Sequence, residues 1–216
     1  MRIIANAPVK GIIQVGANDG GELASFAEVS SNLLLFEPVE QARRVLEQRA
    51  ATLPPSVRIA VSDLIVSDHD GEVDFFVGRE SGNSSMFDLN PARPAAHHHN
   101  VHDRRVRRRS VTLDAFFAEQ RGTLSPADYN YLYMDVQGAE HLVLQGATGT
   151  LRHIDFIWME VSYAPIYLNT MVFWDMCHLC ESLGYFLAFH EESPWNQNQG
   201  DALFVRDERF PQAPTH

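Results

Sequence analysis

Apolar runs of strand length alternate with stretches of helical periodicity along most of the chain. The apolar runs predict strands over 11–15, 33–37, 57–61, 129–136 and 154–161, and the periodic stretches predict helices over 23–29, 39–50, 114–120, 139–146 and 172–183. Two further runs, 185–190 and 202–206, predict a closing pair of strands. Apolar strands that alternate with helices are typical of a mostly parallel sheet with helices on both faces, so we expect an α/β fold.

The middle of the chain follows a different pattern. Polar and apolar residues alternate over 71–77 and regularity returns over 105–113, whereas serine, glycine, asparagine and proline interrupt the residues between them. A long irregular stretch inside a compact domain is typical of a lid or binding loop. We therefore expect one domain over 1–216, with a lid or substrate segment at about 78–104. Within it, Asn83, Ser84 and Ser85 are candidates for closing over a ligand.

Composition and charge narrow the class of protein. The chain has 216 residues, and 17 lysines and arginines against 28 acidic residues give a formal net charge of −11. This balance argues against general electrostatic binding to nucleic acid or anionic membranes. No segment approaches the roughly 20 apolar residues of a membrane span, and no signal peptide is recognised at the start. We expect a soluble, cytoplasmic protein, and the oligomeric state is left open, a homodimer included.

Two clusters of residues have structural explanations. The segment 104–109 is almost entirely arginine. In an edge strand these side chains would face solvent and discourage edge-to-edge pairing, and the alternative is recognition of a phosphate or carboxylate. Cys177 and Cys180 lie in a predicted helix without a second cysteine pair, so buried or half-buried thiols explain them better than a zinc site.

A turn of small residues follows the first predicted strand. Gly16, Ala17, Asn18, Asp19 and Gly20 lie between that strand and the first helix. Small residues there let a ligand approach the backbone, and the helix start offers free amide groups. The spacing differs from the dinucleotide fingerprint, which requires a glycine two positions after the first one.

A second group of candidates follows the next two strands. Glu37 ends the second strand and is followed by Pro38, and at the carboxyl edge of an open sheet its carboxylate can accept both hydroxyls of a ribose. Ser62 and Asp63 follow the third strand, where a polar side chain can reach an adenine amino group. The Ser67-Asp68 pair competes for this role, and we favour Asp63.

Acidic residues also close two later strands. Asp135 ends a strongly apolar strand and Glu160 closes the next one, so we expect both carboxylates at the edge that carries the glycine turn. There they could orient a substrate, contact a cofactor or hold a divalent cation such as Mg²⁺ through oxygen ligands. His190 follows an apolar strand and is a candidate general base. His141, a further candidate base, is expected at the surface.

Short motifs recur in a specific order along the chain. They are 15–20 (VGANDG), 36–38 (FEP), 66–68 (VSD) with 70–71 (DG), 112–114 (TLD), 135–140 (DVQGAE), 143–147 (VLQGA) and 158–161 (WMEV). This ordered set resembles the FkbM-type methyltransferases, and the similarity spans about 11–206. Many members of that family carry lysine and glutamate where this chain has Tyr133 and Gln137.

The resemblance implies the class I (Rossmann-like) methyltransferase fold, with a seven-stranded, mostly parallel sheet and one antiparallel strand near an edge. It implies that Gly16, Asn18 and Gly20 line the methionine part of S-adenosylmethionine, that Glu37 holds the ribose, and that Asp135 faces the transferring methyl group. The family usually methylates hydroxyl groups, often on sugars or natural products.

The expected function is therefore methyl transfer from S-adenosylmethionine to a hydroxyl of a small sugar or natural-product acceptor. Asp135 and Glu160 would lie at the reacting centre, with His190 as a base. Tyr163, Tyr167 and Trp195 are candidates for stacking on the acceptor. Two other classes stay open, a nicotinamide-dependent oxidoreductase on a Rossmann sheet and a binding domain that keeps the fold without turnover.

Overall fold

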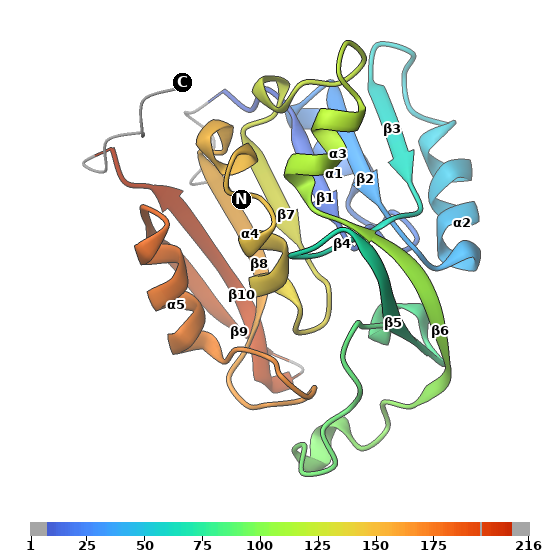
Figure 1. Ribbon diagram of the computed structural model, residues 1–216, viewed down its shortest axis with the longest axis vertical. Helices are drawn as coiled ribbons and strands as arrows, with labels where there is room; N and C mark the ends of the chain where they lie inside the picture. Colours follow the sequence, from blue (N-terminus) through green and yellow to red (C-terminus); the bar gives the residue numbers. More distant parts are fainter. Residues whose placement is uncertain (1–7, 195, 209–216) are drawn as a thin grey trace.

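Seven strands form the main sheet of the protein. The computed structural model describes residues 8–194 and 196–208. The strands are β1 (Ile12–Val15), β2 (Asn32–Phe36), β3 (Arg58–Ser62), β7 (Tyr131–Met134), β8 (Phe156–Ser162), β9 (Tyr185–Ser193) and β10 (Asn196–Arg206). Their order is β3-β2-β1-β7-β8-β10-β9, and β10 runs antiparallel to both of its neighbours while the pairs from β3 to β8 are parallel (Figure 1). The expected mostly parallel, seven-stranded sheet is confirmed.

Helices cover both faces of this sheet (Figure 1). They are α1 (Leu23–Val29), α2 (Glu40–Ala50), α3 (Leu113–Glu119), α4 (Glu140–Gln145) and α5 (Phe173–Ser182). Successive residues of a strand point to opposite faces, so β1 and β2 contribute to two cores. Ile12 and Leu33 pack with side chains of α1 and α2, whereas Ile13 and Leu34 pack with side chains of α3, α4 and α5.

A second, three-stranded sheet lies beside the main one. It contains β4 (Ile65–Val66), β5 (Gly71–Gly78) and β6 (His102–Val111), in the order β4-β6-β5. Figure 1 shows β5 and β6 extending away from the main sheet, with the chain between them at the far end. That connection contains two short 3₁₀ helices, η2 (Ser81–Asn83) and η3 (Ala95–His97). β6 begins at His102, three residues before the position at which the sequence pattern becomes regular again. The last three residues of the segment 78–104 therefore belong to a strand.

The arginine run lies along an edge for most of its length. On one side β6 pairs with β5, but on the other it pairs with β4 only at Ser110 and Val111. Arg105 and Arg107 form ion pairs with Asp74, and Arg109 pairs with a glutamate of α3. These solvent-exposed pairs agree with the structural explanation of the cluster.

The remaining elements differ from the expectation mainly in length. β9 and β10 are longer than predicted because they pair with each other as a bulged antiparallel hairpin, where polar residues are tolerated on the exposed side. β8 continues to Ser162, two residues beyond Glu160, so Glu160 lies within its strand. Two further 3₁₀ helices, η4 (Pro126–Asp128) and η5 (Thr150–His153), precede β7 and β8. Cys180 is buried and Cys177 half-buried, as expected. Within the described part of the chain, no helix has the length and apolar character required to cross a bilayer.

Candidate functional site

One cavity lies at the carboxyl edge of the central strands, with a volume of about 600 Å³. Its lining comes from the turn after β1, the end of β2, the segment around β4 and β5, the η2 region and the turn after β7. The lining residues are Val15, Gly16, Asn18, Phe36, Glu37, Pro38, Leu64, Ile65, Val66, Phe75, Ser81, Gly82, Ser84, Met86, Asp135, Val136, Gln137 and Ala139. Five of the predicted site residues are therefore brought together here: Gly16, Asn18, Glu37, Pro38 and Asp135.

The turn after β1 is held close to the turn after β7. Gly16 has a φ of +84°, and a Cβ at this position would lie 1.9 Å from the carbonyl oxygen of Asp135. Only glycine fits such a left-handed position against another backbone. The other predicted members of the turn do not line the cavity: Ala17 is buried in the core, Asp19 forms an ion pair with Arg49, and Gly20 packs over Leu23 and Leu46 of the adjoining helices.

Glu37 is buried and is held by two backbone hydrogen bonds. Its Oε2 accepts a hydrogen bond from the backbone N–H of Asn18 at 2.7 Å, and its Oε1 accepts one from that of Val39 at 2.7 Å. Burial raises the pKa of this carboxyl from 4.5 to about 7, although the two N–H donors and the nearby Arg43 act in the opposite direction. The carboxyl group thus lies at the cavity wall, and its protonated and ionised forms are both populated near pH 7.

The opposite wall of the cavity is apolar. It is formed by Leu64, Ile65, Val66 and Phe75, which sequence reasoning did not single out. Ser62 and Asp63, the predicted adenine contacts, instead line a separate cavity between α2 and α3, and Ser67 and Asp68 line neither. The motif VSD at 66–68 does contribute to this wall, but through Val66 and not through Ser67 or Asp68.

The roof of the cavity comes from the segment between β5 and β6. Ser81 Oγ donates a hydrogen bond to Asn18 Oδ1 at 2.7 Å, and Ser85 Oγ donates to the backbone oxygen of Gln137 at 2.8 Å. Ser84 lines the cavity. Two of the three polar residues considered for closure, Ser84 and Ser85, are therefore at the roof. Ser81 was missed because no periodicity marks the 3₁₀ turn that carries it.

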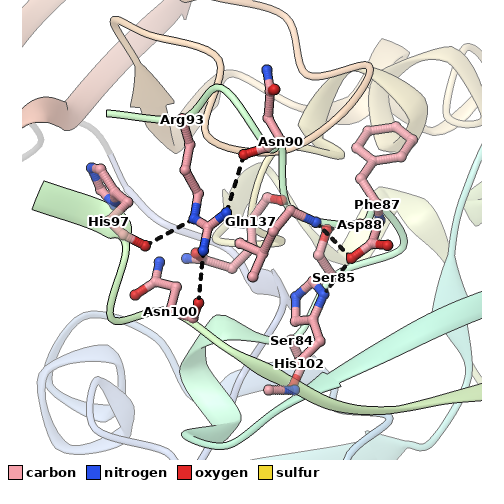
Figure 2. A network of polar contacts seen from close by, with 12 residues as sticks. Ser84, Ser85, Phe87, Asp88, Asn90, Arg93, His97, Asn100, His102 and Gln137 are labelled. Carbon is pink, nitrogen blue, oxygen red and sulfur yellow. Dashed lines mark hydrogen bonds and ion pairs between the residues drawn. The ribbon is translucent and has the colours of Figure 1, made fainter. Parts of the chain in front are cut away.

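The outer part of this segment is organised by Arg93 (Figure 2). Its guanidinium donates to the backbone oxygens of Asn90, His97 and Asn100 at 3.2, 3.0 and 3.3 Å. The segment is also joined to the loop after β8, where the backbone N–H of Asn90 donates to the oxygen of Ile166 at 2.9 Å. The irregular segment is therefore held by hydrogen bonds within itself and by hydrogen bonding to the loop that follows β8.

A polar cluster centred on Gln137 adjoins the cavity. Gln137 Nε2 donates to Asp135 Oδ1 at 2.7 Å and to Glu160 Oε2 at 3.0 Å, and Gln199 Nε2 donates to the same Glu160 oxygen at 2.5 Å. Tyr167 Oη donates to Gln137 Oε1 at 2.7 Å. Burial raises the pKa of Asp135 to about 6 and that of Glu160 well above its ordinary value, and the Gln137 amide opposes both shifts.

Glu140 and His141 follow directly at the start of α4. Glu140 is buried, its Oε1 accepts from the backbone N–H groups of Val136 and Gly138, and burial raises its pKa to about 7. It therefore fastens the turn after β7. The expectation that His141 is a surface residue is wrong: it is 7% exposed, and its ring stacks on Phe87 of the roof segment.

His190 does not reach this cluster. It lies exposed on β9, its ring rests against Phe173, and it is not part of the cavity lining. Tyr163 packs on the same phenylalanine, and Trp195 lies outside the described residues. Between Asp135 and Glu160, an amide N–H donor of Gln137 faces both carboxylates. Over residues 8–194 and 196–208, no group of three or more histidine, cysteine or acidic residues is arranged to hold a metal ion.

Comparison with known proteins agrees with this architecture. The methyltransferase FkbM domain model matches residues 14–187. The 2-O-methyltransferase NoeI of Sinorhizobium fredii is 27% identical over 164 residues, which are 72% of this chain and 65% of that protein, so the match spans less than two thirds of the relative.

Solved structures share the fold. The methyltransferase FkbM of Methylobacillus flagellatus has a TM-score of 0.56 at 14% identity, covering 90% of this chain and 43% of the other. The Streptococcus pneumoniae protein Sp1610, a putative tRNA (m1A22) methyltransferase in complex with S-adenosyl-L-methionine, has a TM-score of 0.52 at 10% identity, covering 98% and 74%. Because the match to the domain model runs from β1 into β9, it includes every segment that borders the cavity, and the chain belongs to the FkbM methyltransferase family.

Proposed function

We propose that this protein transfers a methyl group from S-adenosylmethionine to a hydroxyl of a sugar or natural-product acceptor. The observation that carries the proposal is the single cavity that joins Gly16, Asn18 and Glu37 to Asp135. Membership of the family supports methyl transfer, and the similarity to a 2-O-methyltransferase supports oxygen as the acceptor atom.

The lining suits the proposed cofactor. The apolar wall of Ile65, Val66 and Phe75 would pack on the adenine ring, while the Glu37 carboxylate would accept hydrogen bonds from the ribose hydroxyls. Asn18 and Gly16 would border the methionine part, next to Asp135.

The proposed chemistry is an in-line displacement. S-adenosylmethionine, when bound, supplies an activated methyl group on a sulfonium that departs as a neutral sulfide. The chain's own contribution is to align the hydroxyl oxygen and to remove its proton. Asp135 is suited to accept that proton, because burial brings its pKa to about 6, close to neutral pH, where a base works best.

Water exclusion would come from the roof. The hydrogen bonds from Ser81 to Asn18 and from Ser85 to Gln137 hold the roof against both turns that border the cavity. A closed, less polar site strengthens the electrostatic interactions of Asp135 with the reacting groups. The role of the 78–104 segment as a lid and acceptor-binding segment is part of this proposal.

Isothermal titration with S-adenosylmethionine, S-adenosylhomocysteine and NAD tests the cofactor. We expect saturable binding of the two adenosyl ligands, a loss of that binding in Glu37→Ala, and methyl transfer to a member of a panel of methyl glycosides. Binding of NAD alone would instead favour the oxidoreductase. A folded protein that binds none of the three would favour a binding domain without turnover.

A further inference from the structure

Gln137 has an unusual backbone and a fully used side chain. Its φ is +56°, a left-handed conformation that non-glycine residues seldom adopt, and it is 8% exposed. Such conformations persist where the surrounding structure requires them. The side chain of Gln137 hydrogen-bonds Asp135, directly after β7, and Glu160 on the neighbouring strand β8.

All hydrogen-bonding groups of this side chain are engaged. Nε2 donates one hydrogen bond to Asp135 Oδ1 at 2.7 Å and one to Glu160 Oε2 at 3.0 Å. Oε1 accepts a hydrogen bond from Tyr167 Oη at 2.7 Å. A primary amide has two donor hydrogens on one nitrogen, so it can join two acceptors that face each other. Ionised carboxylates only accept hydrogen bonds, so they pair with the amide nitrogen, and the amide oxygen is left for the tyrosine hydroxyl.

Two buried carboxylates repel each other, and hydrogen-bond donors or a cation placed between them stabilise the pair. Proteins commonly place a divalent cation there, ligated by carboxylate oxygens at about 2.0–2.6 Å. In this protein the Nε2 atom of Gln137 occupies the space between Asp135 and Glu160 and presents N–H groups, which cannot ligate a cation.

We propose that Gln137 is a positioning residue that takes the place of a divalent cation between Asp135 and Glu160, so that this centre works without metal. A glutamate at the same position would present a third carboxylate to the pair and would create a hard-cation site. The effect on turnover rests on the proposed function, whereas cation binding does not.

The test compares Mn²⁺ binding, by electron paramagnetic resonance and calorimetry, to the wild-type chain and to Gln137→Glu. Gln145→Glu is the matched control, because it adds the same charge at an exposed position of α4. We expect no saturable Mn²⁺ binding up to about 1 mM for the wild type and the control, and one site at least about tenfold tighter for Gln137→Glu. Adding Glu160→Gln to that variant is expected to abolish the site.

Three results would overturn the proposal. One is a Mn²⁺ site in the wild type that disappears in Glu160→Gln. Another is a folded Gln137→Glu chain that binds no Mn²⁺, and the third is a Gln137→Glu chain that stays unfolded at every Mn²⁺ concentration while the control folds. Folding of Gln137→Glu only with Mn²⁺ present would support the proposal. S-adenosylhomocysteine binding is measured in parallel, because its absence in the wild type would count against the proposed function and leave the Mn²⁺ result intact.

Discussion

The raised pKa of Glu37 predicts that cofactor binding depends on pH. In the free protein the carboxyl has a pKa of about 7, mainly because it is buried. Hydroxyl donors from a bound ribose would stabilise the ionised form, so the protonated carboxyl must release its proton when the ligand binds. Affinity is then greatest above this pKa and falls about tenfold for each pH unit below it.

The size of the effect follows from the same pKa. Between about pH 8 and pH 5.5 the dissociation constant of S-adenosylhomocysteine should rise ~30-fold, which corresponds to about 2 kcal/mol. The demethylated product is the appropriate ligand because it carries no sulfonium charge, so the measured change reports on the protein carboxyls. Near pH 6, calorimetry in two buffers of different ionisation enthalpy should detect the release of about one proton per ligand bound.

Variants identify the responsible group. Glu37→Gln is expected to bind weakly and with little pH dependence, whereas Glu28→Gln, on the exposed side of α1, should reproduce the wild-type profile. An affinity that is constant from about pH 5.5 to 8 in the wild type would refute the reasoning, since Glu37 would then either be ionised in the free protein or make no contact with the ligand.

Three further changes separate the parts of the site. In Gly16→Ala the new Cβ would lie 1.9 Å from the backbone oxygen of Asp135, so the free energy of unfolding in urea should fall by at least about 2 kcal/mol and S-adenosylhomocysteine binding should be lost. Gly122→Ala is the control, because Gly122 has a similar φ but open space around it. This variant should lose about 1 kcal/mol of stability and bind the ligand normally. Asp135→Asn should slow single-turnover methyl transfer about 100-fold or more, and an unchanged rate would remove Asp135 as the base. Arg93→Met should accelerate amide hydrogen exchange over 88–101 about tenfold without changing exchange in β1 and β7, because three backbone oxygens lose their donor. Arg104 is exposed, and Arg104→Met should leave the exchange rates over 88–101 unaltered.

The main sheet and its ligand edge were predictable from sequence because they depend on local signals. Apolar runs mark the strands, and in a parallel sheet their carboxyl ends meet, which is why Gly16, Glu37 and Asp135 were found together at one cavity. The two faces of the sheet likewise follow from the alternation of side chains along β1 and β2.

Other features of the site depend on contacts between distant segments. β4 has only two residues, too few to show a pattern, yet Ile65 and Val66 form part of the cavity wall. The pattern of its helix predicts that His141 is exposed, but its ring stacks on Phe87 of the segment between β5 and β6, and the residue is buried. The bridging role of Gln137 requires a left-handed φ and a partner on the next strand, neither of which its neighbours in sequence reveal.

If this loop binds the acceptor, as proposed, the way Arg93 holds it has a consequence for how acceptor preference can evolve. Its three partners are backbone oxygens, which every residue type offers, and they all lie within residues 90–100. Ala95 and Ala96 are exposed, and their methyl side chains take no part in these hydrogen bonds. Under the proposed function, substitutions at these positions would change the surface that the acceptor meets, while the loop keeps its conformation and the cavity keeps its own residues. Selection would then act on acceptor choice and methyl donation separately.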